Sequence, residues 1–265
     1  MGSVLTVSAE ESGSVKLLIA AAASLEYSME DELIPLFEEQ NPGITVEGTY
    51  DSSGKLQTQI EEGLEADLFF SAATKQMTAL NEEGLMDSES ITELLENKIV
   101  VIVPKDSELP MEKFEDLVTA DMIGLGDPES VPAGQYAREA LTSLGLWEEA
   151  SARASFGTNV TEVLNWVAEG SADAGVVYAT DAAAKAEDVV VVAEAPEGSL
   201  EKPVLYPVGI LARTEYPEEA ALFLEFLKSD EAMEIFEKYG FSSYLTTEEG
   251  REEAAETEAA ETEAE

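Results

Sequence analysis

The sequence predicts an α/β protein made of two lobes, each with a mainly parallel sheet flanked by helices. Short apolar runs of strand length alternate with helix-length segments along most of the chain, which is the pattern of parallel α/β sheets. The 265 residues are 45% hydrophobic, so the chain can bury a core in one large domain or in two lobes. Two proline-containing apolar segments, residues 98–104 and 202–212, are interpreted as crossings between the lobes.

These two crossings set the expected division of the chain. We expect an N-terminal extension at residues 1–14, a discontinuous first lobe at 15–103 and 204–245, and a second lobe at 104–203. An acidic low-complexity tail would follow at 246–265, where AAETE repeats offer little apolar surface for a core.

The first lobe opens with a predicted strand at residues 15–23. Ser24 then occupies a helix N-cap position before LEYSMEDELIPLFEEQ, where Pro35 should bend the helix. A strand at 44–50 leads through the polar turn Asp51–Gly54 into a second helix. A further strand at 66–71, a helix at 74–84 and the apolar strand at 98–104 complete this part.

The second lobe repeats the alternation. A short strand at 122–126 precedes a turn in which Pro132 can begin a helix, so Ala133 lies at the helix N-terminus. Val160 begins the next helix, and the strand at 174–179 has Tyr178 near its carboxyl end. Another strand at 189–193 completes this lobe, and two helices between 218 and 239 follow in the returning part of the first lobe.

Four strand-to-helix turns could form one binding site, because ligands of α/β sheets lie beyond the strand carboxyl ends. Ser24, Ser53, Ala133 and Val160 mark these turns, and the Tyr178 hydroxyl is a fifth donor. Helix starts have N–H groups without intrahelical acceptors and the positive end of the helix dipole. The set therefore predicts a neutral cage of donors suited to a tetrahedral oxyanion.

Each of these turns also has a simpler structural explanation. Ser24 could be only an N-cap, Ser53 part of a serine turn, and Tyr178 an aromatic residue at a strand end. Lys55 could assist an anion or lie in solvent, while Asp51 would repel an anion unless it points away.

The composition excludes several classes of function. Histidine and cysteine are absent, which removes Ser-His-Asp and Cys-His nucleophiles, disulfides and the commonest zinc sites. No run approaches the ~20 apolar residues that cross a bilayer, and the N-terminus lacks the basic region and long apolar core of a signal peptide. The net charge of −43 opposes nucleic acid and anionic membranes, and is typical of a surface adapted to high salt.

A family resemblance covers residues 15–241. The segments AAAASLEYSMEDELIPLFEEQNPGITVEGTYDSSGKLQTQIEEGLEADLFFSA, KIVVIVPKDS, GLGDPESVPAGQYAREAL, AGVVYATDA and EIFEKYGF occur in an order that resembles the molybdate-binding proteins of ABC importers. The resemblance implies a two-lobed periplasmic-binding-protein fold of type II that closes on molybdate or tungstate. It also implies that Ser24, Ser53, Ala133, Val160 and Tyr178 hold the oxyanion without a metal, cofactor or basic side chain.

The same resemblance implies that the protein is not an enzyme. It implies a monomer that works outside the cytoplasm, with or without a membrane anchor, and delivers its ligand to a membrane permease. Sulfate, thiosulfate or phosphate binding on the same fold remains an alternative, as does a metal-dependent enzyme that uses carboxylates. A third alternative is an acidic surface protein that binds cations through its tail.

Overall fold

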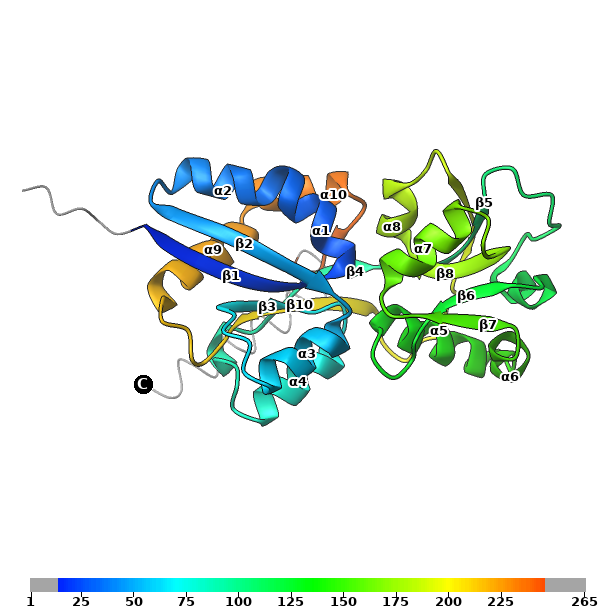
Figure 1. The fold of residues 1–265 in the computed structure, drawn as a ribbon, viewed down its shortest axis with the longest axis horizontal. Helices are drawn as coiled ribbons and strands as arrows, with labels where there is room; N and C mark the ends of the chain where they lie inside the picture. Colours follow the sequence, from blue (N-terminus) through cyan, green and yellow to red (C-terminus); the bar gives the residue numbers. More distant parts are fainter. Residues whose placement is uncertain (1–13, 246–265) are drawn as a thin grey trace, which may run out of the picture.

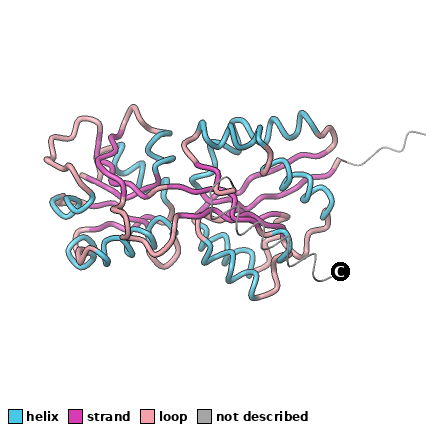
Figure 2. The backbone as a smooth tube through the Cα atoms, turned by 180° about the vertical axis from the view of Figure 1, so that it is seen from behind, coloured by secondary structure: helices cyan, strands magenta, loops and turns pink. Residues whose placement is uncertain are grey.

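The structure is a computed structural model of the chain and describes residues 14–245. The predicted acidic tail and nearly all of the predicted N-terminal extension lie outside the described residues. Two lobes lie side by side, each with a central sheet and helices on both faces (Figure 1). Seen from behind, the strands of both sheets run through the middle of the molecule (Figure 2). The predicted two-lobed α/β fold is confirmed.

The first sheet has the order β11-β4-β10-β3-β1-β2. Its strands are β1 (Val15–Ala22), β2 (Ile44–Asp51), β3 (Leu68–Phe70), β4 (Thr92–Asn97), β10 (Val204–Ile210) and β11 (Ser242–Ser243). The helical segments of this lobe are η1 (Ala23–Leu25), α1 (Glu26–Ser28), η2 (Met29–Leu33), α2 (Ile34–Gln40), α3 (Ser53–Glu61), α4 (Thr74–Glu82), η3 (Ser88–Ser90), α9 (Pro217–Leu227) and α10 (Asp230–Lys238).

The second sheet has the order β7-β6-β8-β5-β9. Its strands are β5 (Ile99–Pro104), β6 (Ile123–Gly126), β7 (Ala154–Gly157), β8 (Ala174–Tyr178) and β9 (Val189–Glu194). The helical segments here are η4 (Phe114–Thr119), α5 (Pro132–Ser143), α6 (Trp147–Ser151), α7 (Val160–Ala168) and α8 (Ala179–Ala184).

Both sheets are mixed, which corrects the expectation of mainly parallel sheets. β1 pairs in parallel with β2 and β3, and β6 pairs in parallel with β7 and β8. β10 is antiparallel to both of its neighbours, and so is β5. The reason is the crossing itself: β5 and β10 enter a lobe from the other one, so they run opposite to the strands that precede the site helices.

The first crossing lies at the start of the segment 98–104 that the sequence suggested. β4 ends at Asn97 and β5 begins at Ile99, and β5 pairs with β8 and β9 in the second sheet. Residues 98–103, which the sequence placed with the first lobe, therefore belong mostly to the second sheet. The apolar sequence of a buried strand does not reveal which sheet it joins. The short strand β4, which precedes β5 in the chain, was also not predicted.

The helix after β1 is divided into several segments, whereas the sequence predicted one helix bent at Pro35. A five-residue π-helix, η2, precedes α2, in which Pro35 lies at the second position. Proline has no N–H and its ring clashes with the carbonyl four residues back, so the preceding turn widens instead of continuing as a regular α-helix. Even so, the helix keeps its apolar side chains Met29, Leu33 and Phe37 fully buried.

The described residues contain no helix long and apolar enough to cross a membrane.

Candidate functional site

The five residues predicted from the sequence line one cavity between the two lobes. Ser24, Ser53, Ala133, Val160 and Tyr178 all contribute to its wall, and we call these five residues the donor cage. The cavity is small, about 10 Å³, which is room for about one water molecule. The structure is therefore a closed arrangement in which the two lobes meet around the site.

Each member of the donor cage follows the carboxyl end of a strand. Ser24 lies in η1 directly after β1, and Ser53 begins α3 after β2. Ala133 is the second residue of α5, which follows β6, and Val160 begins α7 after β7. Tyr178 is the last residue of β8. The topology thus brings four helix starts and one strand end to the same point, as the rule for α/β sheets predicts.

Three backbone N–H groups face this region without an acceptor in their own helix. Ser53 and Val160 are first helical residues and Ala133 is second, so no helical carbonyl lies one turn before them. The Asn159 side chain caps α7 by accepting from Glu162 N at 2.9 Å, which leaves the N–H of Val160 outside the cap. These positions supply positive potential and directional donors for an anion.

Ser24 does not act as the helix N-cap that the sequence suggested. Neither η1 nor α1 has a side-chain cap bond, and the Ser24 hydroxyl lies 2.9 Å from the Tyr206 hydroxyl. Tyr206 is fully buried in β10 and also accepts from Asn97 Nδ2 at 3.1 Å. Tertiary contacts therefore hold this serine in place of local capping.

Ser53 is likewise held by a partner far from its own turn. The N-cap of α3 is its neighbour Ser52, whose hydroxyl accepts from Lys55 N at 3.4 Å. Ser53 is fully buried and its Oγ accepts from Ala72 N at 3.0 Å. Because that oxygen already accepts one hydrogen bond, the Ser53 proton is available for a ligand in the cavity.

Tyr178 is buried as a neutral phenol. Burial and the neighbouring Tyr206 raise the pKa of Tyr178 well above its usual range, so the hydroxyl keeps its proton and can donate. Its oxygen lies 3.5 Å from Ala72 O, a weak bond that a stronger acceptor could replace. Asp181 accepts from Tyr178 N at 3.2 Å, and burial raises the pKa of Asp181 to about 7.

The charged residues beside the cage are paired with each other. Asp51 lines the cavity, but its Oδ1 accepts from Ser52 N at 2.8 Å and lies 3.2 Å from Lys55 Nζ. Asn159 Nδ2, across the lobe boundary, lies 3.4 Å from the same oxygen. The pair leaves the cage without an unpaired charge from these two side chains, so donors and dipoles must carry any anion recognition.

The lobes also touch through backbone at the cavity edge. Gly54 N donates to Ser130 O at 3.0 Å, and a Cβ on Gly54 would lie 2.4 Å from that oxygen. On another side, Gln76 Nε2 lies 3.3 Å from Gln135 Oε1. These contacts exist only when the lobes are together.

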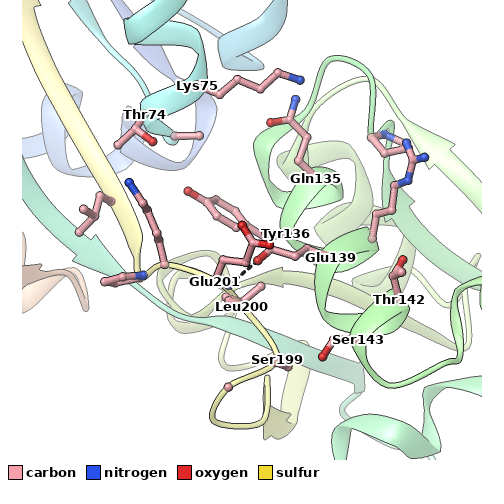
Figure 3. Close-up of a pocket in the computed structure, with 17 residues that line it drawn as sticks. Thr74, Lys75, Gln135, Tyr136, Glu139, Thr142, Ser143, Ser199, Leu200 and Glu201 are labelled. Carbon is pink, nitrogen blue, oxygen red and sulfur yellow. Dashed lines mark hydrogen bonds between the residues drawn. The ribbon is translucent and has the colours of Figure 1, made fainter.

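A larger groove of about 700 Å³ lies beside the cage and contains none of its five residues (Figure 3). Thr74 and Lys75 of α4 face Gln135 and Tyr136 of α5 across it. Its side chains carry both signs of charge: Lys75, Arg138 and Lys202 with Glu139 and Glu201. Glu139 Oε1 accepts a hydrogen bond from Glu201 N at 2.5 Å. The groove lacks the convergence of helix starts that distinguishes the donor cage.

Within residues 14–245, no group of three or more acidic side chains is arranged to hold a metal ion.

Sequence reasoning missed the residues that hold the cage from behind. Asn97, Tyr206 and Ala72 were not singled out, although Tyr206 lies in the predicted apolar segment at 202–212. A tyrosine within an otherwise apolar strand was the available signal, because a buried phenol needs a hydrogen-bond partner. The partner itself, 182 residues away in Ser24, could not be read from the sequence.

Comparisons with known proteins agree with this geometry. The family of bacterial extracellular solute-binding proteins matches residues 17–242. A Bacillus subtilis protein, YvgL, named as an ABC transporter substrate-binding lipoprotein, is 44% identical over 86% of this chain and 87% of its own. The molybdate-binding protein ModA of Haemophilus influenzae is 36% identical over 87% of this chain and 91% of its own.

A solved structure adds the fold. The periplasmic molybdate-binding protein of Azotobacter vinelandii superposes with a TM-score of 0.74 at 25% identity, covering 85% of this chain and 98% of that one. The family match spans nearly all of the described residues and both lobes. The chain therefore belongs to the family of bacterial extracellular solute-binding proteins.

Proposed function

We propose that this protein captures molybdate or tungstate between its lobes and delivers the anion to the permease of an ABC importer. The observation that carries the proposal is the convergence of the five cage residues on one small cavity between the lobes. Relatives that are 36% and 37% identical over most of their length are molybdate-binding proteins, which supports this choice of ligand.

The chemistry of the cage suits a fully deprotonated tetrahedral anion. Serine and tyrosine hydroxyls and backbone N–H groups can all donate, and hydrogen bonds to charged groups contribute roughly 1.5–3 kcal/mol each. A protonated oxyanion would need an acceptor for its own proton, so one cage hydroxyl would have to accept and would no longer donate to the anion. Size would separate sulfate from the larger molybdate and tungstate, because a smaller anion cannot reach every fixed donor.

Capture would require a hinge motion. The present cavity admits about one water molecule, so a tetrahedral anion would enter an open form and be enclosed with slightly wider spacing. We infer that the lobes pivot at Lys98 and at residues 195–203, where the chain passes between the sheets. The lobes would then comprise about residues 15–97 with 204–245, and 99–194.

The remaining features of the proposal follow from the role of a solute-binding protein. The protein would act outside the cytoplasm as a monomer, without a catalytic step or cofactor. The high negative charge would slow the encounter with a dianion at low salt and be screened at molar salt, where the Debye length is about 3 Å. Association should therefore become faster as salt rises.

Sulfate is the main competing ligand, since a sulfate-binding protein of Mycobacterium tuberculosis shares the fold with a TM-score of 0.74. Its 17% identity supports the fold alone. Calorimetric titration of the ligand-stripped protein with molybdate, tungstate and sulfate at molar salt tests the proposal. One-to-one binding of molybdate and tungstate with no sulfate binding is expected. Binding of sulfate alone, or of none of the three, would overturn it.

A truncated chain that ends at residue 245 addresses the alternative of a cation-binding tail. We expect the oxyanion affinity to survive the truncation, because the cage lies wholly within residues 24–178. Loss of oxyanion binding with the tail would instead assign the site, or part of it, to the acidic segment.

A further inference from the structure

A buried chain of polar groups connects the crossing strands to Ser24. It starts at Asn97, the last residue of β4, and passes through Tyr206 of β10 to the Ser24 hydroxyl. The exposed fractions of Asn97, Tyr206 and Ser24 are 4%, 0% and 7%. Buried polar groups of this kind need partners, so the direction of each hydrogen bond is constrained by the bonds around it.

The orientation of the Asn97 amide is fixed first. Its Oδ1 accepts from Lys98 N at 2.8 Å, and a backbone N–H can only donate. The amide nitrogen therefore points the other way, where it donates to Thr180 Oγ1 at 2.9 Å and to the Tyr206 hydroxyl at 3.1 Å. Both protons of the amide are used.

The direction of the next bond follows. The Tyr206 oxygen accepts from Asn97, and the phenol has one proton of its own to place. Within residues 14–245, the one other hydrogen bond of this hydroxyl joins it to Ser24 Oγ at 2.9 Å, where either oxygen could be the donor. Ser24 is therefore the acceptor that the Tyr206 proton requires. If Ser24 donated instead, the phenol proton would be buried without a hydrogen-bonded acceptor, which is unfavourable.

From this geometry we infer that Asn97 and Tyr206 are positioning residues that make Ser24 a donor toward the cavity. Tyr206 donates to Ser24 Oγ, and the serine proton is thereby directed to the ligand. The inference rests on the proposed function in one respect, namely that Ser24 contacts the bound oxyanion. It adds two residues on the crossing strands that set the polarity of a cage hydroxyl without touching the ligand.

The hydrogen bonds of the Asn97 amide also couple ligand affinity to the angle between the lobes. Asn97 immediately precedes Lys98, where the chain passes into the second lobe, and Thr180 belongs to α8 of that lobe. The amide thus bonds the first lobe's Tyr206 and the second lobe's Thr180 at once. A change in lobe angle that breaks one bond of this amide would loosen the orientation of Ser24.

A double-mutant cycle tests whether Tyr206 acts through Ser24. Tyr206→Phe keeps the ring, which packs edge-on against Tyr178 and Phe241, and removes only the hydroxyl. We expect molybdate affinity to fall about 3- to 10-fold in the otherwise unchanged protein, since one neutral hydrogen bond contributes about 1 kcal/mol. In a Ser24→Ala background the same change should have no further effect on affinity. Additive losses would overturn the inference.

Asn97→Asp provides a readout that a purely structural role would not produce. An ionised carboxylate at this position can only accept, so Tyr206 would donate to it and Ser24 would have to donate to Tyr206, away from the ligand. Affinity should therefore fall as pH rises through the pKa of the new carboxyl, and should recover at lower pH where the protonated acid can donate again. This pH dependence should shrink markedly in the Asn97→Asp, Tyr206→Phe double variant, where only the added charge remains.

Controls separate this inference from the proposed function. Tyr50→Phe removes another phenol hydroxyl, one that bonds Glu30 outside the cage, and should leave molybdate affinity unchanged. If the unmodified protein fails to bind molybdate, the proposed function fails. If it binds and Ser24→Ala weakens binding while Tyr206→Phe and Asn97→Asp do not, the inferred relay alone is wrong.

Discussion

The two lobes contribute to the donor cage by different chemistry. The first lobe presents the side-chain hydroxyls of Ser24 and Ser53, each held from behind by a partner. The second lobe presents the helix starts at Ala133 and Val160, whose side chains have no polar atom, and one phenol, Tyr178. Side-chain donors can be deleted by mutation, whereas backbone donors are fixed by the fold.

The difference shows why composition is a poor guide to such a site. An alanine and a valine have no chemistry that would mark them as ligand residues, yet at helix starts that line the cavity their N–H groups lack a helical acceptor. The serines are chemically suggestive, but their positions depend on contacts made by β10 and by Ala72. Each lobe alone supplies only part of a coordination shell, so affinity should depend on closure.

Gly54→Ala should have the largest effect, because it opposes the meeting of the two lobes. A Cβ at this position would lie 2.4 Å from Ser130 O, a backbone atom of the other lobe. Without closure the second lobe's donors are lost together, and we expect molybdate affinity to fall about 100-fold or more. Gln59→Ala, on an exposed site of the same helix, is the control. Small-angle scattering should show ligand-induced compaction in the control only; equal compaction in both proteins would contradict this account.

Val160→Pro should remove a backbone donor while preserving its helix. Proline is favoured at the first helical position, and Asn159 has the extended conformation (φ −155°, ψ 171°) that a residue before proline adopts. We expect about a 10- to 100-fold loss of molybdate affinity in calorimetry. Val160→Ala retains the N–H and should bind normally. An equal loss in both variants would assign the effect to packing.

Ser53→Ala should cause a smaller loss, about 10-fold, because a water molecule can occupy the space of the hydroxyl and restore part of the bonding. It should also lower stability, since Ala72 N loses its buried acceptor. Ser28→Ala, another buried serine of this lobe, whose hydroxyl donates to Leu25 O, is the matched control. It should leave affinity unchanged, and a comparable loss there would refute a specific role for Ser53.

Asp181→Asn should affect stability more than binding. Burial raises the pKa of Asp181 from 3.8 to about 7, so the folded protein holds a proton that the unfolded chain releases. The contribution of this group is present below about pH 4, is lost as pH rises, and is gone above about pH 7. The variant, which can still accept from Tyr178 N, should lose this pH dependence and melt several degrees higher at pH 8, on the order of 5 °C. If the melting temperatures of the unmodified protein and the variant were the same at every pH, Asp181 would be ionised in the folded protein.

Much of the fold and of the candidate site could be predicted from the sequence. Strand-length apolar runs followed by small or polar residues located the turns at Ser24, Ser53, Ala133 and Val160, because such residues are favoured where a helix begins. The family resemblance implied that the residues at these positions bind the oxyanion. The predicted crossing at 98–104 did not show which sheet its strand joins, and the mixed sheets and the π-helix before Pro35 were not predicted, since these depend on which strands pair and not on local periodicity.

The sequence by itself removed the common nucleophiles, since it has no histidine or cysteine, and it placed small or polar residues at the helix starts. The family resemblance added that neutral donors, without a basic side chain, hold the oxyanion. Only the tertiary structure decided which partners hold these donors. Tyr206 reaches Ser24 across 182 residues, and Ala72 reaches Ser53 across 19. The direction of a buried hydrogen bond depends on every neighbour that needs one, and those neighbours are assembled only when the sheets have formed.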